Sequence, residues 1–247
     1  MRVGIKLWSR NDKRHFDEAG FADFIEVMPV DMQSALKVAK RKGCYTVHIP
    51  HEGFGFDPLR NYALSEKLLN LALEAGGKLN AECYIMHTGM LEQKPDEETR
   101  QKALKSIARL AKSANTDKIV IENSGYRSLF NGEPTYNHLC YSPDELKEIL
   151  ELSGAGFCLD FEHASITAAA LGTSYERIID GLMKLKPDYF QISGTRHSTG
   201  ERHLSIFEGD LELDIAKREL KKADKPVCLE TPLDTGQRKR EVEFLKK

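Results

Sequence analysis

The sequence lacks any long hydrophobic run, and no apolar segment approaches the roughly 18–20 residues that a membrane-spanning helix requires. Its first residues, MRVGIKLWSRNDKRH, also lack the apolar stretch and the small-residue cleavage site of a secretory signal peptide. Neither charge sign dominates, because 36 Lys and Arg residues stand against 38 Asp and Glu residues, which gives a formal net charge of −2. These absences predict a cytoplasmic protein with no membrane partner and no global attraction to nucleic acid.

Cysteine is scarce, and its spacing fits neither a ligand set nor a redox pair. None of the five cysteines pairs with another in a Cys-x-x-Cys motif, and four lie in or beside apolar runs. We therefore expect buried free thiols, with no disulfide framework and no cysteine-based zinc site. The sequence also has no G-x-G-x-x-G or Walker loop after any apolar run, which disfavours an open doubly wound sheet.

Short, β-rich apolar runs alternate with longer amphipathic stretches along the chain. Apolar side chains recur at helical spacing in residues 34–42, 64–79, 99–114 and 176–186. The predicted strands are residues 2–8, 21–28, 45–49, 83–87, 118–123, 156–161, 188–193 and 226–231. Strands alternating with helices form right-handed βαβ units, and eight such units in 247 residues predict an α/β fold, a single (β/α)8 TIM-barrel domain over residues 1–247.

Local signals refine the segments between the strands. Asp57-Pro58 and Ser142-Pro143 are each typical of an N-cap followed by proline in the first helical turn. Residues 9–20 leave room for only a short helix. Residues 124–141 are predicted to form a long loop, and loops of this length in compact domains are usually functional or disordered. Its aromatic residues predict a cover over the site, and they are Tyr126, Phe130 and Tyr136.

Histidines and carboxylates gather at the carboxyl ends of the predicted strands, which meet at one mouth of a TIM barrel. These residues are His48, His51, His87, His163, His197 and His203, with Glu122, Asp160, Glu201 and Glu230. Carboxylates that converge raise one another's pKa unless a cation compensates them. Because mixed imidazole and carboxylate ligands favour zinc, manganese or iron over calcium or magnesium, the sequence predicts a divalent metal site.

Several of these strand ends also resemble a known family. The segments IPHEG, IMHTG, VIENSG, FCLDFEHA, ERHLSIFEGDLEL and CLETP are similar to those of the xylose isomerase-like TIM barrels, and within them to the endonuclease IV group of apurinic/apyrimidinic endonucleases. The resemblance covers essentially the whole chain and is strongest from residue 45 to residue 234. Sugar isomerases and epimerases of the same superfamily share much of the pattern.

The resemblance to endonuclease IV implies up to three zinc ions, with manganese as the alternative metal. The implied ligands, ion by ion, are His51, His87 and Glu122; then Glu122, Asp160 and Glu230; then His163, Glu201 and His203. Two positions depart from the family pattern. Gln191 stands where the family has a histidine ligand on the seventh strand, and an amide oxygen is a poorer donor to such a metal. Glu201 replaces an aspartate, which keeps the charge and adds one methylene.

The first hypothesis for function is a metal-dependent phosphodiester hydrolase that acts on abasic sites in DNA. Clustered metals would polarise the phosphate and stabilise the leaving oxygen, with Glu122 and Glu230 as the catalytic carboxylates. The basic, hydroxyl-rich segment 193–203 could hold a phosphate. The residues expected to bind substrate are Arg196, His197 and Tyr126. The segments after residues 28 and 51 do not resemble the family's DNA-contacting loops.

Two alternatives stay open at this point. The first is an isomerase or epimerase of the same superfamily that acts on a small sugar, in which a single metal lies among the carboxylates and Glu122 and Glu230 form an acid/base pair. Glu26 in the second predicted strand suits this alternative. The second is a non-catalytic binding barrel with a degenerate site, a hypothesis that Gln191 motivates. Fold analogy alone cannot choose among the three.

Overall fold

Parallel strands close into a barrel in the computed structural model, which describes residues 1–39, 43–91, 93–130, 133–136 and 139–247. In this part of the chain the barrel has the strand order β1-β12-β9-β8-β5-β4-β3-β2. The barrel strands are β1 (Val3–Trp8), β2 (Phe24–Met28), β3 (Tyr45–His48), β4 (Tyr84–Met86), β5 (Ile119–Glu122), β8 (Gly156–Asp160), β9 (Tyr189–Ile192) and β12 (Val227–Leu229). The predicted TIM barrel is confirmed, and each predicted strand ends within a few residues of an observed one.

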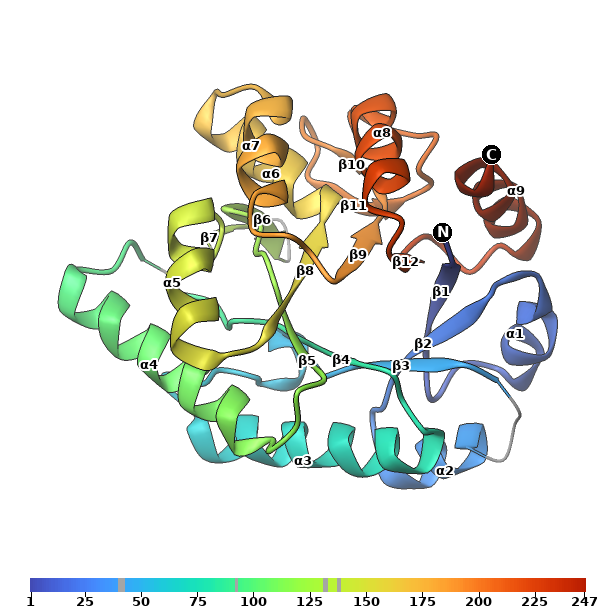
Figure 1. Cartoon of the computed structure of the whole chain (residues 1–247), viewed down its shortest axis with the longest axis horizontal. Coiled ribbons are helices and arrows are strands. Elements are labelled where there is room, and N and C mark those ends of the chain that lie inside the picture. The colour runs from blue at the N-terminus through green and yellow to red at the C-terminus, as the bar shows by residue number, and fades with distance from the viewer. Residues whose placement is uncertain (40–42, 92, 131–132, 137–138) are drawn as a thin grey trace.

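The helices form a ring outside the strands (Figure 1). They are α1 (Lys13–Asp17), α2 (Met32–Ala39), α3 (Tyr62–Leu79), α4 (Glu97–Ser113), α5 (Pro143–Ser153), α6 (Phe161–Leu171), α7 (Tyr175–Met183), α8 (Leu213–Ala223) and α9 (Thr235–Lys246), with 3-10 turns η1 (Glu18–Phe21) and η2 (Glu52–Phe54). Because helices cover the outer face of the sheet, strands such as β3 and β5 are buried along their whole length. No helix among the described residues has the length and apolar character to cross a membrane.

The local signals for helix starts had mixed outcomes. The Ser142 side chain accepts a hydrogen bond from the Glu145 N–H and Pro143 opens α5, as predicted. The predicted start at Asp57 is wrong, because α3 begins at Tyr62. The Asp57 carboxylate instead accepts hydrogen bonds from the N–H groups of residues 59 and 60, and so stabilises a turn that precedes the helix. The short helix expected in residues 9–20 is α1.

Two antiparallel hairpins interrupt the βα alternation. The prediction of a loop over residues 124–141 is wrong in part, since β6 (Arg127–Phe130) pairs with β7 (Glu133–Tyr136). The side chains of Phe130 and Tyr136, which were expected to cover the site, lie outside the described residues. A second hairpin, β10 (Gly194–Arg196) with β11 (Glu201–Leu204), follows β9 and was not predicted. It carries residues 202 and 203 to the mouth of the barrel.

The position of this second hairpin depends on a glycine. A Cβ atom added at Gly194 would lie 2.1 Å from the carbonyl oxygen of Ser205 and 2.5 Å from that of Glu208. Both oxygens belong to the backbone, so they cannot swing away as a flexible side chain would. The hairpin can therefore approach the β9 end this closely only with glycine at residue 194.

We expect Gly194→Ala to lower the free energy of unfolding by about 2 kcal/mol, because it forces backbone atoms apart. Urea unfolding followed by circular dichroism measures the change. Gly20→Ala is the matched control, since a Cβ there meets nothing within 4 Å, and it should leave the midpoint nearly unchanged. Equal midpoints for the two variants would contradict the close approach at Gly194.

Candidate functional site

The polar side chains of the site form a layer directly above a layer of apolar side chains inside the barrel. A separate buried apolar cluster includes Phe24, Ile85, Val120, Cys158, Tyr189 and Cys228. Residues two apart in a strand point to the same face. The residues two positions further along the chain are Glu26, His87, Glu122, Asp160, Gln191 and Glu230. The barrel interior is therefore apolar in one layer and mostly ionisable in the next, at the carboxyl ends of the strands.

A cavity of about 460 Å³ opens above the ionisable layer. This volume lies in the range of small-molecule sites. Six of the predicted site residues line it, namely His51, His87, Glu122, His163, His203 and Glu230. The sequence did not predict other lining residues, among them Lys6, Trp8, Glu52 and Arg202. The structure therefore gathers most of the predicted ligands into one cavity and adds basic groups to them.

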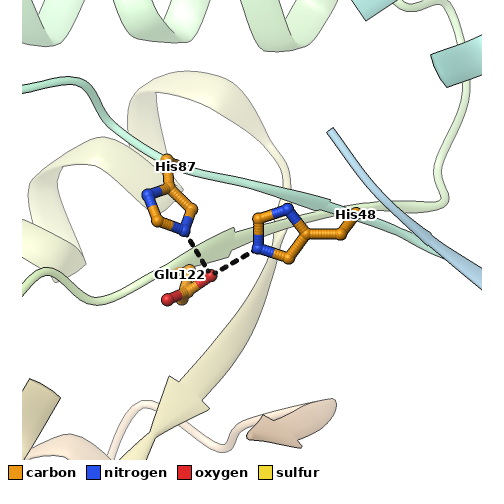
Figure 2. Close-up of side chains that lie close together, drawn as sticks. All are labelled: His48, His87 and Glu122. Atoms are coloured by element: carbon orange, nitrogen blue, oxygen red, sulfur yellow. Dashed lines mark ion pairs between the residues drawn. The ribbon is translucent and has the colours of Figure 1, made fainter. Parts of the chain in front are cut away.

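Three histidines, His48, His87 and His163, surround Glu122 and form with it the histidine side of the site. Figure 2 shows Glu122 between His48 and His87. Its Oε2 atom lies 3.1 Å from His87 Nε2 and 3.4 Å from His48 Nε2, and its Oε1 atom lies 3.0 Å from His163 Nδ1. His48 and Glu122 are buried, with 0% and 3% of their surfaces exposed. The atoms His48 Nε2 and Glu122 Oε2 have no hydrogen-bond partner among the described residues.

Backbone and carboxylate groups fix the direction in which two of these imidazoles point. His48 Nδ1 lies 2.8 Å from the carbonyl oxygen of Ile49, which can only accept, so Nδ1 carries the proton and Nε2 presents its lone pair. That lone pair and Glu122 Oε2 are both acceptors, and a cation between them would satisfy both. His87 Nδ1 lies 3.0 Å from Glu52 Oε2, the carboxylate–histidine pairing that often orients a metal ligand.

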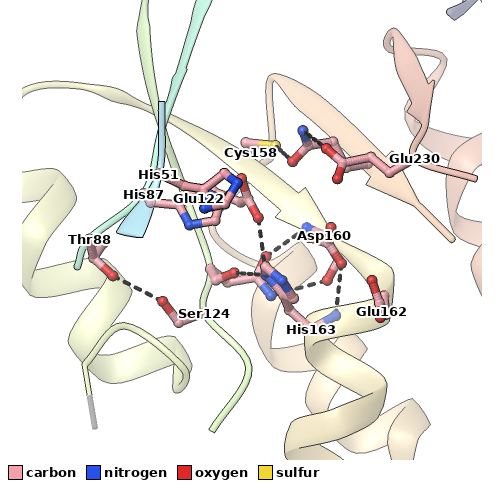
Figure 3. Close-up of polar contacts among 12 residues, drawn as sticks. His51, His87, Thr88, Glu122, Ser124, Cys158, Asp160, Glu162, His163 and Glu230 are labelled. Carbon is pink, nitrogen blue, oxygen red and sulfur yellow. Dashed lines mark hydrogen bonds and ion pairs between the residues drawn. The ribbon is translucent and has the colours of Figure 1, made fainter. Parts of the chain in front are cut away.

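Two sets of potential metal ligands contain Glu122, and the lone pairs of the first face one another. In each set the possible ligand atoms lie within 4.8 Å of one another: His48, His87 and Glu122 in the first, and Glu122, Asp160 and His163 in the second. In the second set His163 Nδ1 lies 2.7 Å from the Asn123 carbonyl oxygen and so carries a proton, and its Nε2 atom contacts Arg202. Asp160 also accepts a hydrogen bond of 2.7 Å from the His163 N–H at the start of α6 (Figure 3). The helix start thus holds the second set in place.

The ionisation of Glu122 and Asp160 depends on the positive charge beside them. Burial opposes the ionisation of Glu122, but the positive charge on His87 and the hydrogen bond from His163 hold the pKa of that carboxyl well below its usual range. Burial raises the pKa of Asp160 to about 7, against the opposing effect of His163 and with a further contribution from the Glu122 charge. Against the effect of burial, the charges of Glu122 and Glu52 raise the pKa of His87, so a divalent cation would have to displace a proton from this imidazole before it could stabilise the two carboxylates.

The third implied ligand set is not assembled in the structure. Glu201 is half exposed and contacts Arg196 and Thr199 instead of the cavity. His203 Nδ1 lies 3.4 Å from Glu162 and 3.7 Å from Glu230. Arg202 contacts His163 Nε2 and donates a hydrogen bond of 3.1 Å to Glu162, which was not among the predicted residues. An arginine therefore lies where the resemblance implied a metal ion.

The carboxylates on the opposite side of the cavity are paired with donors from the chain itself. Lys6 Nζ lies 2.7 Å from Glu230 Oε1. Gln191 Nε2 donates to Glu230 and, at 2.9 Å, to Glu26, while Gln191 Oε1 accepts from the Cys158 thiol. Burial opposes the ionisation of Glu230, yet Lys6 lowers its pKa to about 2. Burial raises the pKa of Glu26 to about 8, against the effect of Lys6.

The cavity-lining residues do not include the three predicted to bind substrate, all of which are described. Arg196 is paired with Glu201. His197 Nε2 lies 3.0 Å from the Ser165 hydroxyl. The Tyr126 ring packs edge-on against Tyr141 at 4.8 Å, which joins the segment after β5 to the start of α5. These side chains support the loops around the mouth.

His51, a predicted ligand, lines the cavity beside the first donor set. Its Nδ1 atom accepts a hydrogen bond from the Gly53 N–H at 3.1 Å, and its ring stacks on His87 with centroids 5.6 Å apart. Burial lowers the pKa of His51 to about 3, with a further contribution from His87, so the ring is neutral. His48 is thus better placed than His51 to share an ion with Glu122, because its Nε2 atom faces that carboxylate directly.

The sequence of the chain matches a known family over most of its length. Residues 14–247 match the family model described as xylose isomerase-like TIM barrel. The chain belongs to this family. The predicted resemblance is thereby confirmed at the level of the family. No curated protein matches the chain in sequence.

Similar solved structures include proteins of different activities. They are a D-tagatose 3-epimerase-like protein (TM-score 0.72, 15% identity, 100% of this chain and 98% of that one), the TTHB071 protein from Thermus thermophilus soaked with ZnCl2 (0.71, 18%, 99% and 98%) and endonuclease IV from Thermus thermophilus (0.70, 15%, 100% and 98%). At these identities the likeness shows the fold. The choice of activity has to come from the site.

We expect Glu122→Gln to weaken zinc affinity by on the order of 100-fold, because it removes the charge that both donor sets share. Isothermal titration calorimetry of the chelator-treated protein measures this. Glu151→Gln, an exposed change of the same chemistry, is the control and should leave affinity unaltered. Equal affinities for the two variants would exclude Glu122 as a ligand.

We also expect His48→Gln to reduce metal affinity more than His51→Gln. The reason is that His48 Nε2 faces Glu122 without a hydrogen-bond partner among the described residues, whereas His51 Nδ1 already accepts a hydrogen bond from the backbone. Competition with a chromogenic chelator ranks the two variants, with circular dichroism as the check on folding. The opposite ranking would support the ligand set implied by sequence resemblance.

Proposed function

We propose that the chain is a metal-dependent phosphodiester hydrolase that acts on abasic sites in DNA, with zinc as the preferred metal and manganese as the alternative. The observation that carries this proposal is the placement of imidazoles against both oxygens of Glu122. A carboxylate placed in this way can bridge two ions, and paired ions are typical of phosphodiester hydrolysis. The first ion would be held by His48, His87 and Glu122. The second would be held by Glu122, Asp160 and His163, once Arg202 withdraws from His163 Nε2.

The chain's own residues have separable tasks in this proposal. Metal ions, when bound, supply Lewis acidity to a phosphoryl oxygen. Glu52 holds His87 in orientation, and the Ile49 carbonyl does the same for His48. Arg202, which pairs with Glu162, and Lys6, which pairs with Glu230, line the cavity and offer it cationic hydrogen-bond donors for a phosphate.

The mouth of the cavity also favours a nucleic-acid substrate. Trp8 lines the cavity, is 45% exposed and contacts the Phe54 ring edge-on at 5.7 Å. The exposed Trp8 ring, backed by the partly buried Phe54 and next to basic groups, offers a stacking surface to an unpaired base or to a sugar ring. An abasic nucleotide has to leave the duplex before a cavity of about 460 Å³ can enclose it.

A second candidate function is the isomerisation or epimerisation of a sugar. The volume of the cavity favours it, since a single sugar would fit there, and an epimerase-like protein has a similar fold. In that case Glu122 and Glu230, on opposite sides of the cavity, would be the acid/base pair. The pairing of Glu230 with Lys6 and Gln191 argues against it, because a single-metal site among the carboxylates needs Glu230 as a ligand.

The two functions are separated by metal content and by activity on matched substrates. We expect about two zinc ions per chain by elemental analysis of protein purified without chelator. We also expect incision of an abasic duplex but not of the intact duplex, and binding of the abasic duplex should weaken steeply with added salt. Fluorescence anisotropy and gel electrophoresis provide the readouts.

Three results would overturn the hydrolase. One ion per chain together with ketose epimerisation would support the sugar enzyme. No ion, even after incubation with zinc or manganese, would support a binding barrel. Failure to bind abasic DNA at low salt, with two ions present, would retain the metal centre but exclude DNA as the substrate.

A further inference from the structure

Another set of potential metal ligands, distinct from the two that contain Glu122, lies on the side of the cavity away from His163. Donor atoms of Glu26, His48 and Glu230 lie within 4.8 Å of one another. Glu26 and His48 are fully buried. By distance alone, this set is as well formed as the two that contain Glu122.

An ammonium group already lies at this set. Lys6 Nζ is 2.7 Å from Glu230 Oε1 and 3.7 Å from Glu26 Oε1, and its side chain is only 11% exposed. The amide nitrogen of Gln191 donates to the same two carboxylates. Each carboxylate therefore already has a donor from the chain, and Lys6 brings the positive charge.

We propose that the Lys6 ammonium takes the place of a metal ion between Glu26 and Glu230. The single free lone pair of His48, at Nε2, belongs to the ion that it would share with Glu122. A zinc ion would need the Glu230 oxygen at about 2.0–2.2 Å, within the space that the ammonium occupies, and the two cations would repel each other. Lys6 supplies a fixed positive charge there, and Gln191 supplies a neutral donor.

The consequence is that ions bind only on the histidine side of Glu122. This inference deepens the proposed function. It rests on that function for the statement that ions bind on the histidine side, but the contact between Lys6 and Glu230 is independent of it. It also assigns Glu230 a role different from the one implied by sequence resemblance: a partner of Lys6 rather than a ligand. A phosphate or sugar oxygen entering the cavity on this side meets an ammonium group instead of a metal.

The direct test is the metal content of Lys6→Met, which keeps the length of the side chain and removes its charge. We expect this variant to bind one more zinc ion per chain than the natural protein, as measured by inductively coupled plasma mass spectrometry after dialysis. Its melting temperature should fall without metal and recover when zinc is added. Lys6→Arg, which keeps the charge, and Lys102→Met, at an exposed site, are the controls and should keep the natural content.

A folded Lys6→Met variant with the natural metal content would overturn the proposal. Should that variant fail to fold, Glu230→Gln provides the second test. The proposal expects Glu230→Gln to retain every ion of the natural protein, because Glu230 is not a ligand, and the loss of one ion would overturn it.

The same measurements distinguish this inference from the proposed function. If the natural protein binds no metal, the hydrolase fails. Lys6→Met would then still be expected to gain one ion, from none to one. If the natural protein binds two ions and Lys6→Met also binds two, the hydrolase remains and the role of Lys6 is excluded.

Discussion

Neutralising buried carboxylates is the constraint on which this site depends. Glu26, Glu122, Asp160 and Glu230 come from four different strands or strand ends and meet inside a closed barrel, where water cannot solvate them freely. Unpaired charges in such a place are costly, so each needs a proton, a cation or several hydrogen bonds. The histidines, the lysine and the glutamine around them each meet part of this need.

The two sides of the cavity meet the constraint differently. On the histidine side, Glu122 faces imidazoles through both oxygens, and a pair of acceptor atoms has no hydrogen-bond partner among the described residues. On the other side, Lys6 and Gln191 satisfy Glu230 with donors that belong to the chain. A site that is open to cations on one side and closed to them on the other differs from a single-metal site shared among all the carboxylates.

The fold and much of the site follow from local sequence pattern. Apolar runs of strand length between amphipathic stretches predicted the barrel, because this periodicity needs no knowledge of distant contacts. The position of Glu122, Asp160 and Glu230 at strand ends predicted a shared mouth. Strand alternation puts Lys6 on the same face of β1 as Gly4, but it does not show which carboxylate Lys6 meets. The hairpin β10–β11 could not be predicted, because its position depends on close backbone contacts with residues 205 and 208.

The sequence by itself determined the barrel, the family and the ring of histidines and carboxylates, since strand periodicity and strand-end chemistry are local properties. Tertiary structure alone decided which donors face each other. Glu201 turns outward to Arg196, while its neighbour Arg202 turns inward to His163. Lys6 reaches Glu230 from 224 positions away in the chain because β1 and β12 pair to close the barrel. Spacing in sequence carries no information about such contacts, which arise only when the first and last strands meet.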